Sequence, residues 1–194
     1  MMRVEKTLPD HYREIFSVNL QRDKKTAVWI NALSLLIAVP LAVAGHWMVP
    51  IHALFDFSQG MGAYALRCGA LIVGMIVYMV LHELVHGITM KYFGAGKIRY
   101  GFTGLYAYAG ADDYFDKSSY IIIALAPVVF WGVALAVISL FVSPGWFWVV
   151  YGIQIVNLSG AAGDLYVTAK FSRMPSDILV KDVGIGMTVY SATV

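Results

Sequence analysis

The chain has 194 residues, of which 59% are hydrophobic and only 13% are charged, and its formal net charge is +2. Soluble domains contain about 25% charged residues. This composition therefore excludes an ordinary soluble domain and indicates an integral membrane protein. The small net charge argues against nucleic acid as a partner. The single cysteine, Cys68, excludes an intrachain disulfide and a cysteine-based zinc cage.

Residues 1–25 form a polar stretch that carries acidic and basic side chains together. We expect a cytoplasmic N-terminal arm ahead of the membrane domain. Within this arm, Tyr12–Leu20 has the pattern of a short amphipathic helix on the membrane surface. A solvated arm without a helix is the alternative.

Four apolar runs follow, and each is long enough for a membrane-spanning helix, which needs about 20 residues. The sequence predicts spans at about residues 26–49, 63–92, 118–142 and 146–171. Proline is expected to kink the first span at Pro40 and the third at Pro127. The predicted fold class is an all-α integral membrane protein, with a four-helix membrane domain over residues 26–171 and a cytoplasmic tail over 172–194.

Two stretches outside the spans have the pattern of strands. Residues 97–116 are rich in Gly and Tyr, and apolar and polar residues alternate from Ile98 to Thr103. This pattern predicts a short cytoplasmic or interfacial β-hairpin between the second and third helices. The hairpin is either a substrate-docking edge strand or a plain connection. In the tail, Ile178–Val183 and Met187–Tyr190 have the composition of small strands.

The distribution of lysine and arginine predicts the orientation. Six of these residues precede the first predicted span, and four lie from the end of the second span to the start of the third (Lys91, Lys97, Arg99 and Lys117), whereas none lies between the third and fourth. One, Arg67, lies at the start of the second span. Because loops rich in Lys and Arg stay in the cytoplasm, both termini and the hairpin are predicted to be cytoplasmic.

The segment His82-Glu83-Leu84-Val85-His86, near the end of the second span, matches the pattern H-E-x-x-H. Residues four apart lie on one face of a helix, so His82 and His86 can offer two imidazole nitrogens to one Zn²⁺. Glu83 stands beside them, where it can hold and deprotonate a water on the metal. The motif therefore predicts a hydrolytic zinc site.

A catalytic zinc site needs a third protein ligand, and depth in the membrane favours Asp164. His82 and His86 follow Arg67 by 15 and 19 residues, about 22–28 Å of helix. Asp164 follows Trp146 by 18 residues, about 27 Å along a helix that runs in the same direction. The remaining candidates lie in loops, in the N-terminal arm or near the opposite face: Asp112, Asp113, Asp116, His11, His46 and His52.

Asn157 lies seven residues before Asp164, two helical turns earlier and near the same face. We predict that it is a second catalytic residue, which stabilises the oxyanion or holds the substrate backbone. A structural hydrogen bond between helices is the alternative.

Together these residues resemble the site-2 protease group of intramembrane zinc metalloproteases. In that group an HExxH helix supplies two His ligands and the Glu base, and a later Asn-to-Asp motif supplies the third ligand, here Asp164. Gly160 and Leu165 stand where that motif usually has proline and glycine. From Leu71 to Asp182 the chain more closely resembles the bacterial membrane family of zincin peptidases known as domain of unknown function 3267.

The resemblance implies a zinc-dependent, membrane-embedded metalloprotease that hydrolyses a peptide bond in or near the bilayer. Its cofactor would be Zn²⁺, its substrate a membrane protein or peptide, and its location the bacterial cell membrane, as a multi-pass protein. The alternatives are a zinc hydrolase of a lipid or small substrate, and a non-catalytic metal-binding membrane scaffold. The sequence leaves the substrate, the regulator and the oligomeric state open.

Overall fold

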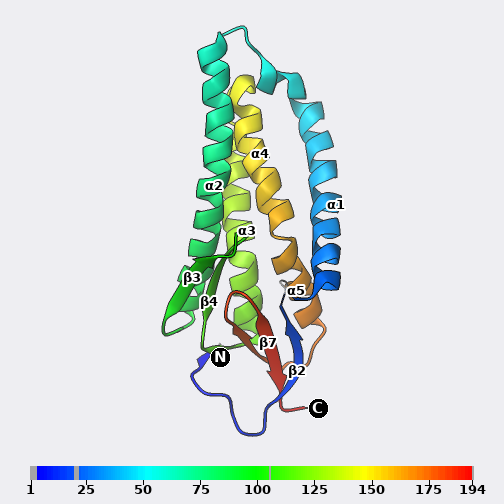
Figure 1. Cartoon of the computed structure of the whole chain (residues 1–194), viewed down its shortest axis with the longest axis vertical. Coiled ribbons are helices and arrows are strands. Elements are labelled where there is room, and N and C mark those ends of the chain that lie inside the picture. The colour runs from blue at the N-terminus through cyan, green and yellow to red at the C-terminus, as the bar shows by residue number, and fades with distance from the viewer. Residues whose placement is uncertain (1–3, 20–21, 105, 194) are drawn as a thin grey trace. The chain divides into compact units, whose positions relative to one another are not determined.

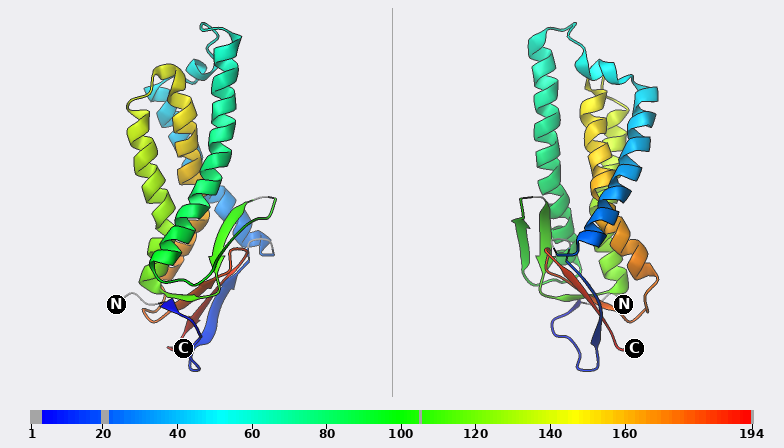
Figure 2. Two further views of the ribbon diagram at one scale, coloured as in Figure 1. Left: turned by 90° about the vertical axis from the view of Figure 1, so that its left-hand side faces the viewer. Right: turned by 45° about the vertical axis from the view of Figure 1, so that its right-hand side comes forward.

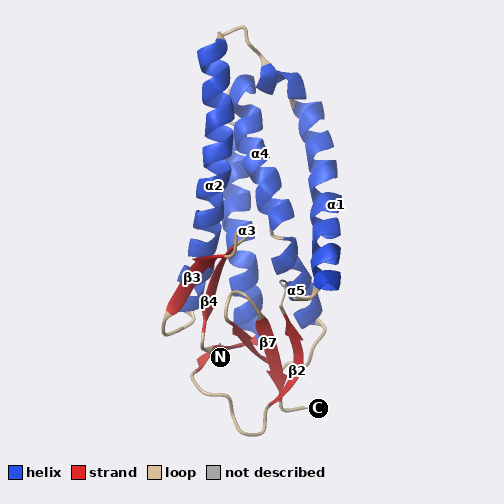
Figure 3. Cartoon of the chain, viewed as in Figure 1, coloured by secondary structure: helices blue, strands red, loops and turns tan. Residues whose placement is uncertain are grey.

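The structure is a computed structural model that describes residues 4–19, 22–104 and 106–193 (Figures 1 and 3). Its helices are α1 (Lys24–Met48), the 3₁₀ helix η1 (Ile51–Phe55), α2 (Met61–Tyr92), α3 (Lys117–Ser139), α4 (Pro144–Gly160) and α5 (Ala162–Ser172). Its strands are β1 (Val4–Glu5), β2 (Arg13–Val18), β3 (Ile98–Phe102), β4 (Ala107–Ala111), β5 (Tyr114–Asp116), β6 (Leu179–Asp182) and β7 (Met187–Ser191).

The chain divides into two compact units. The first, called the sheet unit below, comprises residues 1–30, 82–127 and 163–194. The second, called the helical unit, comprises residues 31–81 and 128–162. All the predicted metal ligands belong to the sheet unit and therefore lie within one compact body.

Three helices, α1, α2 and α3, are long and apolar enough to cross a membrane. Large apolar side chains are exposed on them, including Trp29, Leu36 and Val133, as a lipid-facing surface requires. The predicted fourth span is not one continuous helix, because α4 ends at Gly160 and α5 begins at Ala162. The prediction of four spans is therefore not confirmed.

The prediction of an all-α fold is wrong. Within the described residues the sheet unit contains a five-stranded antiparallel sheet with the strand order β1-β5-β6-β7-β2. Strand β2 pairs with β7 through Phe16 and Val189, and β1 pairs with β5 through Val4 and Phe115. The N-terminal arm and the C-terminal tail each have too few apolar residues for a core, and they bury these residues by pairing.

Two predictions for the arm and the tail have opposite outcomes. The helix expected over Tyr12–Leu20 is wrong: residues 13–18 form β2, and Leu20 lies outside the described residues. The two small strands expected in the tail are confirmed as β6 and β7.

One face of the five-stranded sheet packs on α3 and α5. Phe115 and Val180 from the sheet, Ile123 from α3 and Phe171 from α5 are all buried in this core. The packing holds the first half of α3 against the sheet, and this part of α3 borders the candidate metal site.

The predicted hairpin is confirmed as β3 and β4, which pair from Ile98 opposite Ala111 to Phe102 opposite Ala107. It extends from the end of α2 (Figure 2). Tyr108 on β4 fits against two glycines, since a Cβ at Gly101 or Gly184 would lie 2.4 Å or 2.0 Å from its ring. This contact joins the hairpin to the β6–β7 turn. A substrate-docking role for the hairpin stays a prediction.

Candidate metal site

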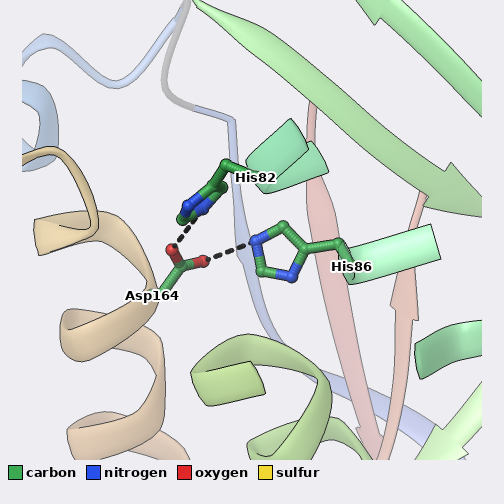
Figure 4. A group of neighbouring side chains, drawn as sticks. All are labelled: His82, His86 and Asp164. Carbon is green, nitrogen blue, oxygen red and sulfur yellow. Dashed lines mark ion pairs between the residues drawn. The ribbon is translucent and has the colours of Figure 1, made fainter. Parts of the chain in front are cut away.

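The site is built from the end of α2 and the start of α5. His82 and His86 lie one turn apart on α2, as the motif predicts, and their ring centroids are 4.9 Å apart. Asp164 lies in the first turn of α5, where the positive end of the helix dipole favours a carboxylate. Figure 4 shows the three side chains directed toward one another.

The distances fit a zinc site. His82 Nε2 lies 3.4 Å from Asp164 Oδ2, and His86 Nε2 lies 3.5 Å from Asp164 Oδ1. One ligand atom from each residue lies within 4.8 Å of the others. Ligand atoms at the corners of a zinc tetrahedron are about 3.3 Å apart for metal–ligand bonds of about 2.0 Å. Two imidazoles and one carboxylate are also a donor set that Zn²⁺ accepts, so these residues could hold the ion after a small adjustment.

The second ring nitrogen of His86 has its own partner. His86 Nδ1 lies 2.9 Å from the backbone carbonyl oxygen of Ile123 on α3. A carbonyl can only accept, so Nδ1 carries the proton and donates. This leaves the Nε2 lone pair of a neutral ring on the side of Asp164, as a metal ligand needs.

Glu83, the predicted base, belongs to the same electrostatic cluster. Its carboxyl lies near His86, Asp164 and the backbone of Ala109 on β4. The pKa of Tyr100 on β3 is raised mainly by burial and to a smaller extent by the charge of Glu83. The hairpin therefore forms one wall around Glu83.

A shallow open groove of about 510 Å³ lies between α2 and β3. Its lining residues are Gly87, Ile88, Lys91, Gly96, Lys97, Ile98 and Tyr100. The three metal ligands are not among these lining residues, but Gly87 lies one helical turn from Glu83 on α2.

Asn157 is fully buried and belongs to the helical unit. It accepts a 2.8 Å hydrogen bond from the Tyr78 hydroxyl and donates to the carbonyl of Val128 at 3.3 Å and to Gln154 Oε1 at 3.4 Å. These contacts supply the structural bond between helices that was the alternative for this residue. Its catalytic role stays a prediction.

Other acidic and histidine candidates have partners away from this cluster. Asp112 pairs with Arg99 at 2.5 Å, and Asp113 pairs with Lys6 at 3.0 Å. His46 Nδ1 accepts a hydrogen bond from the backbone N–H of Ile51. The group of potential metal ligands found among the described residues is His82, His86 and Asp164.

Sequence reasoning missed the contacts that support the ligands. Ile123 contributes a backbone carbonyl, and the identity of a residue does not indicate such a role. A hydrogen bond from Tyr120 to Asp182 joins α3 to β6, and no pattern in the sequence singled out either residue. The one sign in the sequence is the proline four residues after Ile123, because proline has no N–H to donate to this carbonyl within the helix.

The apolar helices, the two imidazoles, the carboxylate and the neighbouring glutamate define a candidate metal-dependent hydrolase. The comparisons give the family: the chain belongs to domain of unknown function 3267, described as "Putative zincin peptidase", which matches residues 75–179. The family predicted from the sequence is thus confirmed.

A relative from Pyrococcus woesei, named "Uncharacterized 24.7 kDa protein in gap 5'region", is 33% identical over 124 residues. The match covers 59% of this chain and 51% of the relative, so the chain spans about half the length of that protein. No solved structure matches the chain.

Proposed function

We propose that this chain is a zinc-dependent metallopeptidase that hydrolyses a peptide bond in or near a membrane. The observation that carries the proposal is the convergence of His82, His86 and Asp164 from two helices, with Glu83 beside them. Membership of a family described as a zincin peptidase supports the reaction class. The apolar lengths of α1, α2 and α3 support a membrane location.

His82, His86 and Asp164 would hold the zinc ion. When bound, the zinc supplies a Lewis acid that polarises the scissile carbonyl and lowers the pKa of a water molecule. The backbone carbonyl of Ile123 fixes the ring of His86. Asp164, in the first turn of α5, brings the negative charge that offsets part of the charge of the cation.

Glu83 is the proposed general base and acid. It takes a proton from the attacking water, whose oxygen bonds to the carbonyl carbon, and it then gives a proton to the leaving amine nitrogen. Asn157 remains the candidate for stabilising the oxyanion or the substrate backbone. The groove between α2 and β3 would bind an extended peptide near Glu83, which lies one helical turn from the lining residue Gly87.

We further propose a multi-pass protein of the bacterial cell membrane, with both termini in the cytoplasm. The support is the concentration of Lys and Arg up to the first turn of α1 and from the end of α2 to the start of α3. The site would then lie toward the cytoplasmic side, where water can reach it.

The test measures the zinc content of the purified protein and its cleavage of a protein substrate. Purified wild type should hold one zinc per chain and cleave fluorescein-labelled casein, whereas His86→Ala and Asp164→Ala should lose the zinc. Glu83→Gln should keep the zinc and lose cleavage. Asp112→Asn is the matched control, because Asp112 is an exposed acid paired with Arg99, and it should change neither property.

Two results would redirect the proposal. Zinc retained by Asp164→Ala would remove Asp164 from the ligand set. Full zinc content without cleavage of casein, but with Glu83-dependent cleavage of a lipid ester in mixed micelles, would favour the lipid hydrolase. If the protein is a non-catalytic scaffold, the Glu83→Gln variant should keep its function in the cell.

A further inference from the structure

The carbonyl of Ile123 lies in the middle of α3 and has lost its usual partner. In an α-helix the N–H of each residue donates to the carbonyl four residues earlier. The residue four positions after Ile123 is Pro127, which has no N–H. The proline ring also crowds this carbonyl, and the crowding tilts the carbonyl away from the helix axis.

The position is buried, so water does not replace the missing donor. Ile123 is 1% exposed, and the side chain of Pro127 is among the fully buried ones. A buried carbonyl without a donor is unfavourable. The donor that the structure provides is Nδ1 of His86, at 2.9 Å.

This contact determines which nitrogen of His86 is available. Because the carbonyl can only accept, Nδ1 carries a proton, and Nε2 is the nitrogen that holds the lone pair when the ring is neutral. Nε2 is the atom that lies 3.5 Å from Asp164. Partners of this kind orient metal-binding histidines and raise their affinity for the metal.

We propose that Pro127 is a positioning residue of the metal site: it removes a helix hydrogen bond so that the Ile123 carbonyl can fix the orientation and tautomer of His86. The inference rests on the proposed function in taking His86 as a zinc ligand. It gives the proline inside α3 a chemical role in addition to a bend in the helix.

The test is Pro127→Ala, which restores an N–H that competes for the Ile123 carbonyl and lets the helix straighten. Zinc affinity of the purified protein, measured by competition with a fluorescent chelator, should fall about tenfold. In the metal-free protein, at a pH where the His86 ring is neutral, ¹⁵N NMR of His86 should change from one tautomer with the proton on Nδ1 to a mixture. Pro40→Ala, in α1, is the matched control and should leave both readings unchanged.

Wild-type affinity together with an unchanged His86 spectrum in Pro127→Ala would overturn the inference. Alanine favours helix more than proline does, so the variant should fold. If it does not, Pro127→Val supplies the same N–H and fills more of the buried space. The NMR measurement of the His86 tautomer needs no zinc. It therefore tests the role of Pro127 even if the wild-type protein binds no zinc and the proposed function is wrong.

Discussion

Tyr120 on α3 donates a hydrogen bond to the carboxylate of Asp182 on β6, although the two residues are 62 positions apart. The same carboxylate accepts a 2.8 Å hydrogen bond from the backbone N–H of Gly184 in the β6–β7 turn. Tyr120 precedes Ile123 by about one helical turn, on the same face of α3. The C-terminal hairpin is thereby joined to the turn of α3 that carries the acceptor of His86.

Replacing Tyr120 by Phe should destabilise the sheet unit. The substitution removes the donor to a half-buried carboxylate, and a hydrogen bond to a charged group contributes about 1.5–3 kcal/mol. Thermal unfolding in detergent, followed by circular dichroism, should show a lower midpoint. Tyr92→Phe is the control, because the side chain of Tyr92 is 83% exposed. Equal midpoints for both variants would contradict the assigned role of the pair.

Asp182 should also make stability depend on pH. Burial raises the pKa of its carboxyl above the ordinary value of 3.8. The folded protein therefore binds this proton more tightly than the unfolded chain does. The stabilising contribution is fully present below about pH 3.8 and is lost as the pH rises through the raised pKa.

The measurement compares metal-free wild type with Asp182→Asn, which keeps the shape of the side chain and does not titrate. The free energy of unfolding of wild type, relative to the variant, should fall as the pH rises from about 4. A difference that stays constant, or that rises with pH, would show that the pKa of Asp182 is not raised.

The metal ligands were predictable because each can be recognised from a short stretch of the sequence. The spacing of His82 and His86 requires only a helix, and Asp164 is an acid in an apolar region that needs a partner. The depth argument assumed one continuous fourth helix, which Ala161 interrupts. Asp164 still meets the histidines, because α5 presents it in its first turn.

The five-stranded sheet was not predictable from local pattern. Strands β1 and β2 come from the first 18 residues and pair with strands that lie about 100 or more positions away. In such short strands, alternation does not identify the partner. The hairpin β3–β4 was predictable because both of its strands lie in one continuous stretch of the sequence.

Gly110→Ala should loosen the hairpin from the sheet. A Cβ at this position would lie 2.4 Å from the carbonyl carbon of Val183 and 2.6 Å from the nitrogen of Gly184. Both are backbone atoms, so the strand itself must move, at a cost of about 1–3 kcal/mol. Because Gly110 follows Ala109, whose backbone lies near Glu83, the proposed peptidase activity should fall with stability.

The control for that variant is Gly69→Ala in α2, where nothing lies within 4 Å of an added Cβ. Alanine inside a helix is favoured over glycine by about 0.5–1 kcal/mol, so this variant should be as stable as wild type or slightly more stable. If Gly110→Ala behaved like Gly69→Ala in unfolding experiments, β4 would not be packed against the β6–β7 turn.

The proposed topology can be tested with single cysteines. In a Cys68→Ala background, Gln59→Cys places a thiol in the exposed loop before α2, and Ser176→Cys places one in the exposed loop between α5 and β6. A membrane-impermeant maleimide added to intact cells should label the first thiol directly. It should label the second only after permeabilisation, because the positive-inside rule keeps the basic segments in the cytoplasm. The reverse pattern would place both termini and the metal site on the outer side of the membrane.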